Sequence, residues 1–163
     1  MKKLFLVMLI VPALSLSAQT AKLPSAAAEI DTLMRTNAVS AAAAARFILE
    51  AANLLPEGPS GPLKGSEAET AAFNLALSKN WLKGAASDTV TLKDTAFLIM
   101  QSFGFKGGVM YSLTKSPRYA YREMIYNQLI QGSASPGMKV SGERLLHIIG
   151  KALSHSEETN EKN

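Results

Sequence analysis

The chain has 163 residues, 17 of them Lys or Arg and 13 Asp or Glu, so its formal net charge is only +4. A charge this small lacks the basic field typical of nucleic-acid-binding proteins, and we expect no nucleic-acid partner. The chain contains no Cys, which excludes disulfides, thiolate metal sites and the lipid attachment of a bacterial lipoprotein.

The first 18 residues have the order of a secretory signal peptide. Lys2 and Lys3 precede an apolar run from Leu4 to about Leu14, and small residues follow up to Ala18. This run is about half the length of a membrane-spanning helix, which needs roughly 20 apolar residues. We therefore expect export to the periplasm, cleavage after about Ala18 and no transmembrane segment in the mature chain. Loss of the two lysines lowers the net charge to +2.

A pattern recurs about every 50 residues in the mature chain. In each copy a Val and a hydroxyl residue precede a segment whose apolar residues recur at steps of three and four. The three pairs are Val39-Ser40, Val90-Thr91 and Val140-Ser141. This spacing predicts a helix with one buried face in each copy. Ser40, Thr91 and Ser141 lie where a side-chain oxygen can cap the first turn, and Asp94 is placed for a capping box with Thr91.

The first of these three segments is rich in alanine. Alanine has the highest helix propensity, and its small side chain allows neighbouring helices to approach closely. We therefore expect a tightly packed helix here rather than a membrane-active one. Arg46 and Glu50 lie four residues apart and are expected to form a surface ion pair.

A second helix is expected ahead of each cap. Residues 73–82 match residues 121–130 at an offset of 48, and Gly84 and Gly132 follow as left-handed helix terminators. The corresponding helix of the first copy is shorter, and segments rich in Gly, Pro and Ser read as loops between the copies.

These features predict one all-α domain over residues 19–153, with about six helices and little or no sheet. The three helix-loop-helix repeats are expected at about 25–55, 66–104 and 116–153. The polar residues 154–163 carry no core-forming side chain, so we expect a disordered tail.

This arrangement resembles the S-layer homology family, in which an aromatic-led helix, a Gly, a short loop and Val-Ser or Val-Thr precede a second helix. The resemblance covers about residues 25–153 and is best over 66–104 and 116–153. It implies three repeats packed around a pseudo-threefold axis, with cell-wall polymer or peptidoglycan bound in the grooves between them.

One departure concerns the polymer-binding signature of that family, Thr-Arg-Ala-Glu at the start of the second helix. Only the hydroxyl residue is kept in all three copies, and the Arg position holds Ala41, Leu92 and Gly142. The resemblance therefore implies a similar scaffold whose polymer-binding function is lost or relocated.

Residues with catalytic or metal-binding chemistry are few. The two histidines, His147 and His155, cannot supply the three ligands that a zinc site needs, and we expect His147 at the edge of the core. Ser112 and Lys115 have the Ser-x-x-Lys spacing of penicillin-binding enzymes, but the partner motifs of that family are missing. We expect no catalysis, no cofactor and no metal.

The segment 111–132 combines aromatic and basic side chains, a composition favoured at carbohydrate and protein contacts. Tyr121 aligns with Phe73 and is expected in the core. The remaining candidate binding residues are Lys115, Arg118, Tyr119, Arg122 and Tyr126.

Two functions are favoured for the exported chain, and a small periplasmic enzyme is a third, less favoured alternative. The first is a non-enzymatic scaffold or protein-interaction module of the cell envelope, which predicts a contiguous apolar patch. The alternative is a cell-wall glycan or peptidoglycan-binding module, which predicts exposed Tyr and Arg along a groove between repeats.

Overall fold

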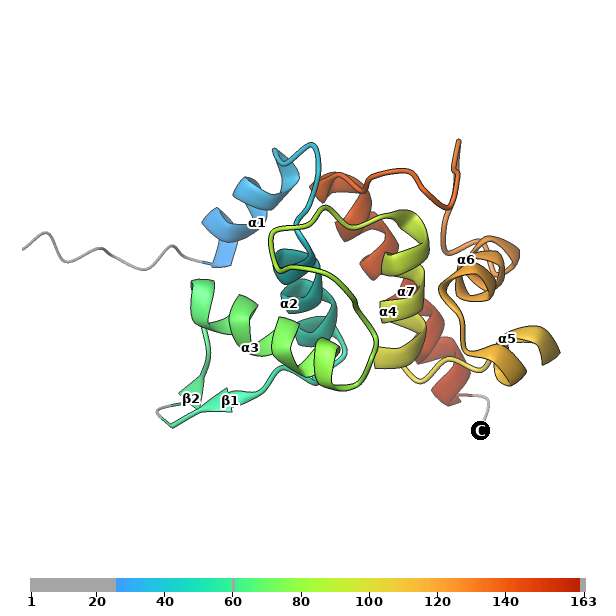
Figure 1. Ribbon diagram of the computed structural model, residues 1–163, viewed down its shortest axis with the longest axis horizontal. Coiled ribbons are helices and arrows are strands. Elements are labelled where there is room, and N and C mark those ends of the chain that lie inside the picture. The colour runs from blue at the N-terminus through green and yellow to red at the C-terminus, as the bar shows by residue number, and fades with distance from the viewer. Residues whose placement is uncertain (1–25, 60, 162–163) are drawn as a thin grey trace, which may run out of the picture.

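The computed structural model describes residues 26–59 and 61–161, and the predicted signal peptide lies outside them. Within these residues the chain forms seven helices and one two-stranded antiparallel sheet (Figure 1). In chain order they are α1 (Ala26–Met34), α2 (Ala41–Ala51), β1 (Glu57–Gly58), β2 (Gly61–Pro62), α3 (Gly65–Ser78), α4 (Leu92–Ser102), α5 (Val109–Thr114), α6 (Pro117–Tyr126) and α7 (Gly142–Glu161). The prediction of an all-α fold is confirmed. Over the same residues, none of the helices has the length and apolar character that crossing a membrane requires.

The helices α2, α4 and α7 begin at the three predicted caps. The Ser40 and Ser141 hydroxyl oxygens accept hydrogen bonds from the backbone amides of Ala43 and Arg144, at 3.2 and 3.3 Å. At the start of α4 the Asp94 carboxylate accepts the Thr91 amide at 3.3 Å and also receives the Thr91 hydroxyl. Each bond occupies a polar group that the helix start would otherwise leave unpaired.

The three residues that precede these caps meet in a closed ring of backbone hydrogen bonds. The amide of Val39 donates to the carbonyl of Val140 (2.8 Å), that of Val90 to Val39 (3.0 Å) and that of Val140 to Val90 (3.2 Å). All three valines are buried. The starts of α2, α4 and α7 are therefore held around one point in the core, although they lie about 50 residues apart in the sequence.

The first turns of the same helices are also satisfied by neighbouring loops. The amide of Ala41 donates to the Asp88 carbonyl at 2.7 Å, and that of Leu92 donates to the Met138 carbonyl at 2.9 Å. The amide of Gly142 donates to the Thr36 carbonyl at 2.8 Å. In each case the carbonyl comes from a loop that leads into another of the three helices, so the loops tie the helix starts together.

Gly84 and Gly132 do not terminate helices, which corrects the prediction. Both have positive φ, but α3 ends at Ser78 and α6 at Tyr126, six residues earlier. The left-handed residues after these helices are Asn80 (φ 57°) and Gln128 (φ 58°). The physical reason is that the apolar residues expected in the last turn instead follow the left-handed residue and fold back onto the core.

The helices pack in pairs around a single core. Helix α2 lies on α3, α4 lies on α6, and α1 lies on α7. The larger fully buried aliphatic side chains are Ile48, Leu49, Leu92, Leu98, Ile99, Met124, Leu145 and Ile148. The positions of the repeated apolar pattern include Ile48, Leu98, Ile99 and Ile148. Leu49, Leu92 and Leu145 lie outside it, and Tyr121 is only partly buried against this core.

Helix α5 lies in a segment expected to be a loop. Its Tyr111 side chain is buried, and Gln101 Nε2 donates a hydrogen bond to the Tyr111 hydroxyl oxygen at 2.7 Å. Burial raises the pKa of Tyr111 above its ordinary value of 10.0, the hydrogen bond from Gln101 opposes this rise, and the nearby Glu123 carboxylate adds to it. The hydrogen bond from Gln101 links α5 to α4, and α5 also packs against α6.

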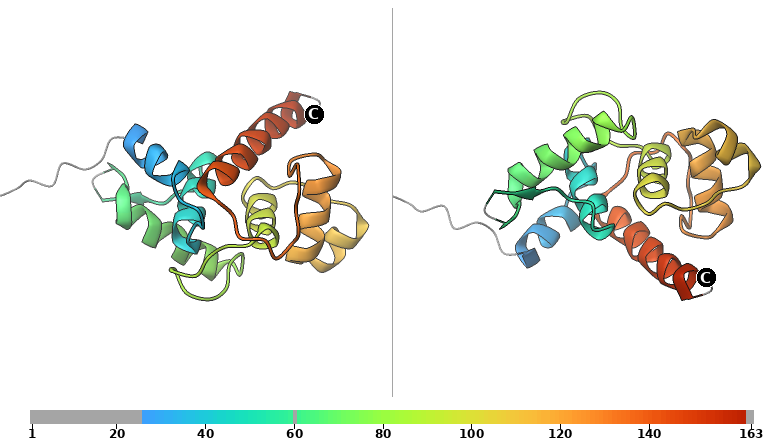
Figure 2. Two further views of the ribbon diagram at one scale, coloured as in Figure 1. Left: turned by 90° about the horizontal axis from the view of Figure 1, so that it is seen from above. Right: turned by 90° about the horizontal axis from the view of Figure 1, so that it is seen from below.

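Two further expectations differ from the structure. Helix α7 continues to Glu161, through most of the predicted disordered tail, and Figure 2 shows its C-terminal half extending away from the other helices. Arg46 is not a surface residue: it is 6% exposed and its guanidinium donates to the Glu29 carboxylate of α1. The Glu50 carboxylate lies 3.8 Å from Arg46 Nε. Arg46 is buried because α1 brings Glu29 over this side of α2.

Candidate functional site

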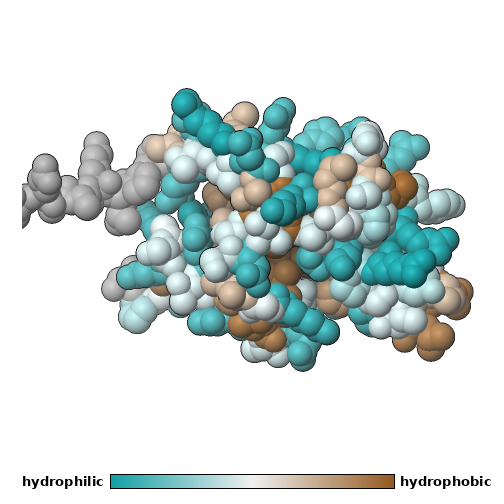
Figure 3. Space-filling view, turned by 45° about the horizontal axis from the view of Figure 1, so that its top comes forward, coloured by the Kyte–Doolittle hydropathy of each residue, from teal (hydrophilic) through white to brown (hydrophobic). Residues whose placement is uncertain are grey.

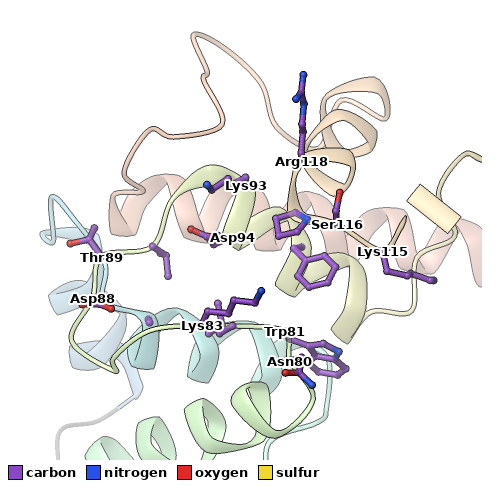
Figure 4. Close-up of a pocket in the computed structure, with 15 residues that line it drawn as sticks. Asn80, Trp81, Lys83, Asp88, Thr89, Lys93, Asp94, Lys115, Ser116 and Arg118 are labelled. Carbon is purple, nitrogen blue, oxygen red and sulfur yellow. The ribbon is translucent and has the colours of Figure 1, made fainter. Parts of the chain in front are cut away.

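A groove of about 750 Å³ lies on the described residues, and we call it the cationic groove. Its walls come from the start of α2, the loop over residues 80–90, the first turns of α4 and the entrance to α6. Figure 4 shows these segments converging on one space. The ring of hydrogen bonds at Val39, Val90 and Val140 places two of them, because it fixes the α2 start and residue 90 side by side.

Basic side chains dominate the charge of the cationic groove. Lys83, Lys93, Lys115 and Arg118 line it, and all four are exposed. Across residues 26–59 and 61–161, none of the four forms an ion pair; the pairs found there join Arg35 with Asp31 and Arg46 with two glutamates. Their positive charges are thus available to a ligand.

The two acidic side chains of the groove are engaged with the backbone. Asp88 accepts the amide of Ala85 at 2.7 Å. Asp94 accepts the amide and hydroxyl of Thr91 in the capping box. Both carboxylates therefore shape the loop and the helix start, and they leave the groove with two more cationic than anionic side chains.

Two aromatic rings add apolar area to the cationic groove. Phe97 is buried at its base, and Trp81, the only Trp of the chain, is half-buried in its wall. Lys79 Nζ lies 5.3 Å from the centroid of the Trp81 ring. In Figure 4 the Lys83 side chain extends toward the middle of the groove, whereas Arg118 and Lys115 point outward at its rim.

The side chains of the groove are suited to binding an anionic ligand. Amines and a guanidinium recognise anionic oxygens by charge-assisted hydrogen bonds, and a half-buried indole offers a flat apolar face. A search of residues 26–59 and 61–161 finds no group of three His, Asp or Glu side chains that could hold a metal ion. His147 is exposed, not at the core edge, and His155 lies against Phe105 with ring centroids 5.1 Å apart.

The five predicted binding residues do not form one site. Lys115 and Arg118 line the cationic groove. Tyr119, Arg122 and Tyr126 instead line a separate depression of about 370 Å³ between α5 and α6. The Arg122 guanidinium lies 5.9 Å from the Tyr119 ring centroid, so these two residues stack on each other there.

Sequence reasoning missed Trp81, Lys83 and Lys93. Trp81 falls within residues 73–82, which the repeat predicts to be helical, whereas α3 ends at Ser78. The pair Lys79-Asn80 carried the signal, since Asn is among the residues that adopt the left-handed conformation at helix ends. An earlier helix end would have placed Trp81 and Lys83 together in a loop.

Of the three positions that hold Arg in the S-layer pattern, Ala41 lines the cationic groove, whereas Leu92 and Gly142 do not. Ala41 and Leu92 are buried. A Cβ atom on Gly142 would overlap the carbonyl oxygen of Leu33 at the end of α1. The cationic side chains of the groove come from other positions.

Comparison with protein-family models, with curated proteins and with solved structures finds no match to this chain.

Proposed function

We propose that this protein binds an anionic glycan of the cell envelope in the cationic groove. The observation that carries the proposal is a groove lined by the half-buried Trp81 and by four exposed cationic side chains that form no ion pair among the described residues; Lys83 extends toward its middle (Figure 4). Carboxylate or phosphate groups on a sugar would accept hydrogen bonds from Lys83 and Lys93. The indole of Trp81 would pack on the apolar face of a sugar ring.

We further propose that the fold is a relative of the S-layer homology scaffold, with its three repeats at α1–α2, α3–α4 and α6–α7. The closed ring of hydrogen bonds through Val39, Val90 and Val140 supports this, because each valine precedes the second helix of one repeat. On this scaffold the binding cations lie at new positions, since the Arg position of each repeat holds an uncharged, buried residue.

Export accompanies this proposal, because an envelope glycan lies outside the cytoplasm. The order of basic, apolar and small residues over residues 1–18 supports export, as the sequence predicts. The other function considered, a protein scaffold, needs a large apolar surface. The clearest exposed aliphatic cluster on the described residues comprises Val109, Met110 and Leu113 on α5, which is small for that role.

Co-sedimentation with insoluble cell-wall sacculi tests the proposed function. Residues 19–163 contain every described residue and lack the apolar leader, so this chain is the sample. We expect saturable binding that falls at least about tenfold in Lys83→Gln/Lys93→Gln, since hydrogen bonds to charged groups contribute about 1.5–3 kcal/mol each.

Matched variants test whether the loss of binding is specific to the cationic groove. Lys64→Gln/Lys151→Gln removes the same charge from exposed positions outside the groove and is expected to bind like the wild type. Arg122→Gln tests the second depression and is expected to have little effect. Undiminished binding by Lys83→Gln/Lys93→Gln, or no binding by the folded wild type, would refute the proposed function.

A further inference from the structure

Helix α5 presents aliphatic side chains to solvent. Val109 and Leu113 are 82% and 80% exposed, and they lie one turn apart on the same face of the helix. Met110 beside them is 49% exposed. Tyr111 holds the opposite side of α5 in the core, so these side chains project outward from a fixed helix. In Figure 3 hydrophobic side chains gather at the lower right, at the end of the molecule where Figure 1 places α5.

Helix α6 extends this surface. Tyr126 is 84% exposed and lines the depression between α5 and α6 together with Val109, Met110 and the exposed Arg122. The acidic residue of this depression, Glu123, is turned toward the start of α5, because a Cβ on Gly108 would lie 3.0 Å from its carboxylate oxygen. We call the four side chains Val109, Met110, Leu113 and Tyr126, with Arg122, the α5 face.

Basic residues outnumber acidic ones in the part of the sequence that carries α5 and α6. Residues 95–142 contain five of the 17 basic residues, namely Lys106, Lys115, Arg118, Arg122 and Lys139, but only one of the 13 acidic residues, Glu123. The remainder of the chain holds 12 basic and 12 acidic residues. Four of the five basic residues of this segment lie in α5 and α6 or within a few residues of them, whereas Lys139 pairs with Thr91 at the start of α4.

We propose that the α5 face docks on the surface of an anionic phospholipid membrane. Aliphatic side chains that project from a short helix can enter the boundary between headgroups and acyl chains, and nearby basic residues are attracted to anionic lipid. An exposed Tyr suits the same boundary, because its ring is apolar and its hydroxyl polar.

The size of the α5 face favours a membrane over a protein partner. A stable protein interface places about 20–30 residues on each side, with a packed apolar centre. The α5 face offers four apolar side chains and a shallow depression. A fluid lipid surface needs no matching shape, so a few inserted side chains and a positive field suffice to hold the protein there.

Vesicle co-sedimentation of residues 19–163 tests the proposal. The probes are vesicles of phosphatidylglycerol and phosphatidylcholine in a 3:7 ratio and vesicles of pure phosphatidylcholine. We expect binding to the mixed vesicles, weak binding to the neutral ones and a marked loss at high salt, because surface charge attraction is screened. Met110→Asp and Leu113→Asp are each expected to weaken binding at least about tenfold, because the free energy gained by burying the aliphatic side chain in the lipid is lost.

Two control variants separate the α5 face from general effects of the same substitutions. Met34→Asp changes a methionine of similar exposure, 52%, on α1 at the other end of the molecule and is expected to leave binding unchanged (Figure 1). Lys64→Glu makes the same charge change as Arg122→Glu away from the α5 face, and only Arg122→Glu is expected to weaken binding. Circular dichroism verifies the fold of each variant.

Three outcomes would overturn the proposal: no vesicle binding by the wild type, equal binding to neutral vesicles, or equal loss in Met34→Asp and Met110→Asp. Self-association that Leu113→Asp abolishes, without vesicle binding, would assign the α5 face to a second copy of the chain. Sacculus binding by Leu113→Asp is expected to stay intact, because the α5 face and the cationic groove have no residue in common.

Discussion

Substitution of Gly142 by Ala is expected to destabilise the fold strongly. A Cβ at this position would overlap the carbonyl oxygen of Leu33, so the end of α1 must move away from α7. This movement weakens the 2.8 Å hydrogen bond from Gly142 to Thr36, worth about 1 kcal/mol. It also exposes part of Leu33, whose side chain is buried and contributes about 1.5–3 kcal/mol. The free energy of unfolding should therefore fall by about 2–4 kcal/mol.

Urea denaturation followed by circular dichroism at 222 nm measures this change. Gly150→Ala is the matched control, because Gly150 lies in the same helix and an added Cβ there meets no atom within 4 Å. It should stabilise the protein by about 0.5–1 kcal/mol, the difference in helix propensity. If Gly142→Ala were as stable as Gly150→Ala, the result would contradict the close approach of α1 to α7 at Gly142.

Three other predictions concern caps, buried charge and pH. Asp94→Ala removes the return bond of the capping box and should lower the free energy of unfolding by about 1 kcal/mol in urea denaturation. Glu29→Ala should cost about 3 kcal/mol in the same assay, because the charge of buried Arg46 loses its partner, and the apolar pair Glu29→Leu/Arg46→Met should recover most of it. The folded pKa of Tyr111 is raised above its unfolded value of 10.0, so the stability that depends on neutral Tyr111 is fully present below pH 10.0. It should fall by up to about 1.4 kcal/mol per pH unit as the pH rises toward the folded pKa. Urea denaturation from pH 8 to 11 should show this fall reduced in Tyr111→Phe.

The three capped helices could be predicted from the sequence because their signals are local. A hydroxyl residue followed by apolar steps of three and four marks the starts at Ser40, Thr91 and Ser141 and the buried stripes behind them. The helix ends were misjudged because Asn80 and Gln128 adopt the left-handed conformation, while the more obvious glycines lie further on.

Helix α5 and the extension of α7 depend on contacts that no local pattern reveals. The segment 109–114 follows two glycines and precedes Ser-Pro, which reads as a loop, and its helix is held by the burial of Tyr111. The α7 extension carries few apolar residues, but its His155 ring packs edge-on against Phe105 in the loop after α4. Both contacts arise only once the chain has folded.

The cationic groove could be predicted only in part. Lys115 and Arg118 stood out because they lie in an aromatic and basic segment. Trp81, Lys83 and Lys93 come from two other segments, and the ring of backbone hydrogen bonds brings these segments to the groove. Sequence spacing alone does not indicate which loops such a ring brings together.

The most direct test of the proposed function uses the fluorescence of Trp81, because the only Trp of the chain lies in the cationic groove. Solubilised anionic wall glycan should shift or quench its emission in a saturable titration, and neutral glycan of the same length should not. The affinity measured in this titration should fall at least about tenfold in Lys83→Gln/Lys93→Gln, because charge-assisted hydrogen bonds are lost. If neither the anionic nor the neutral glycan changes the emission of the folded protein, the result would contradict glycan binding in the groove.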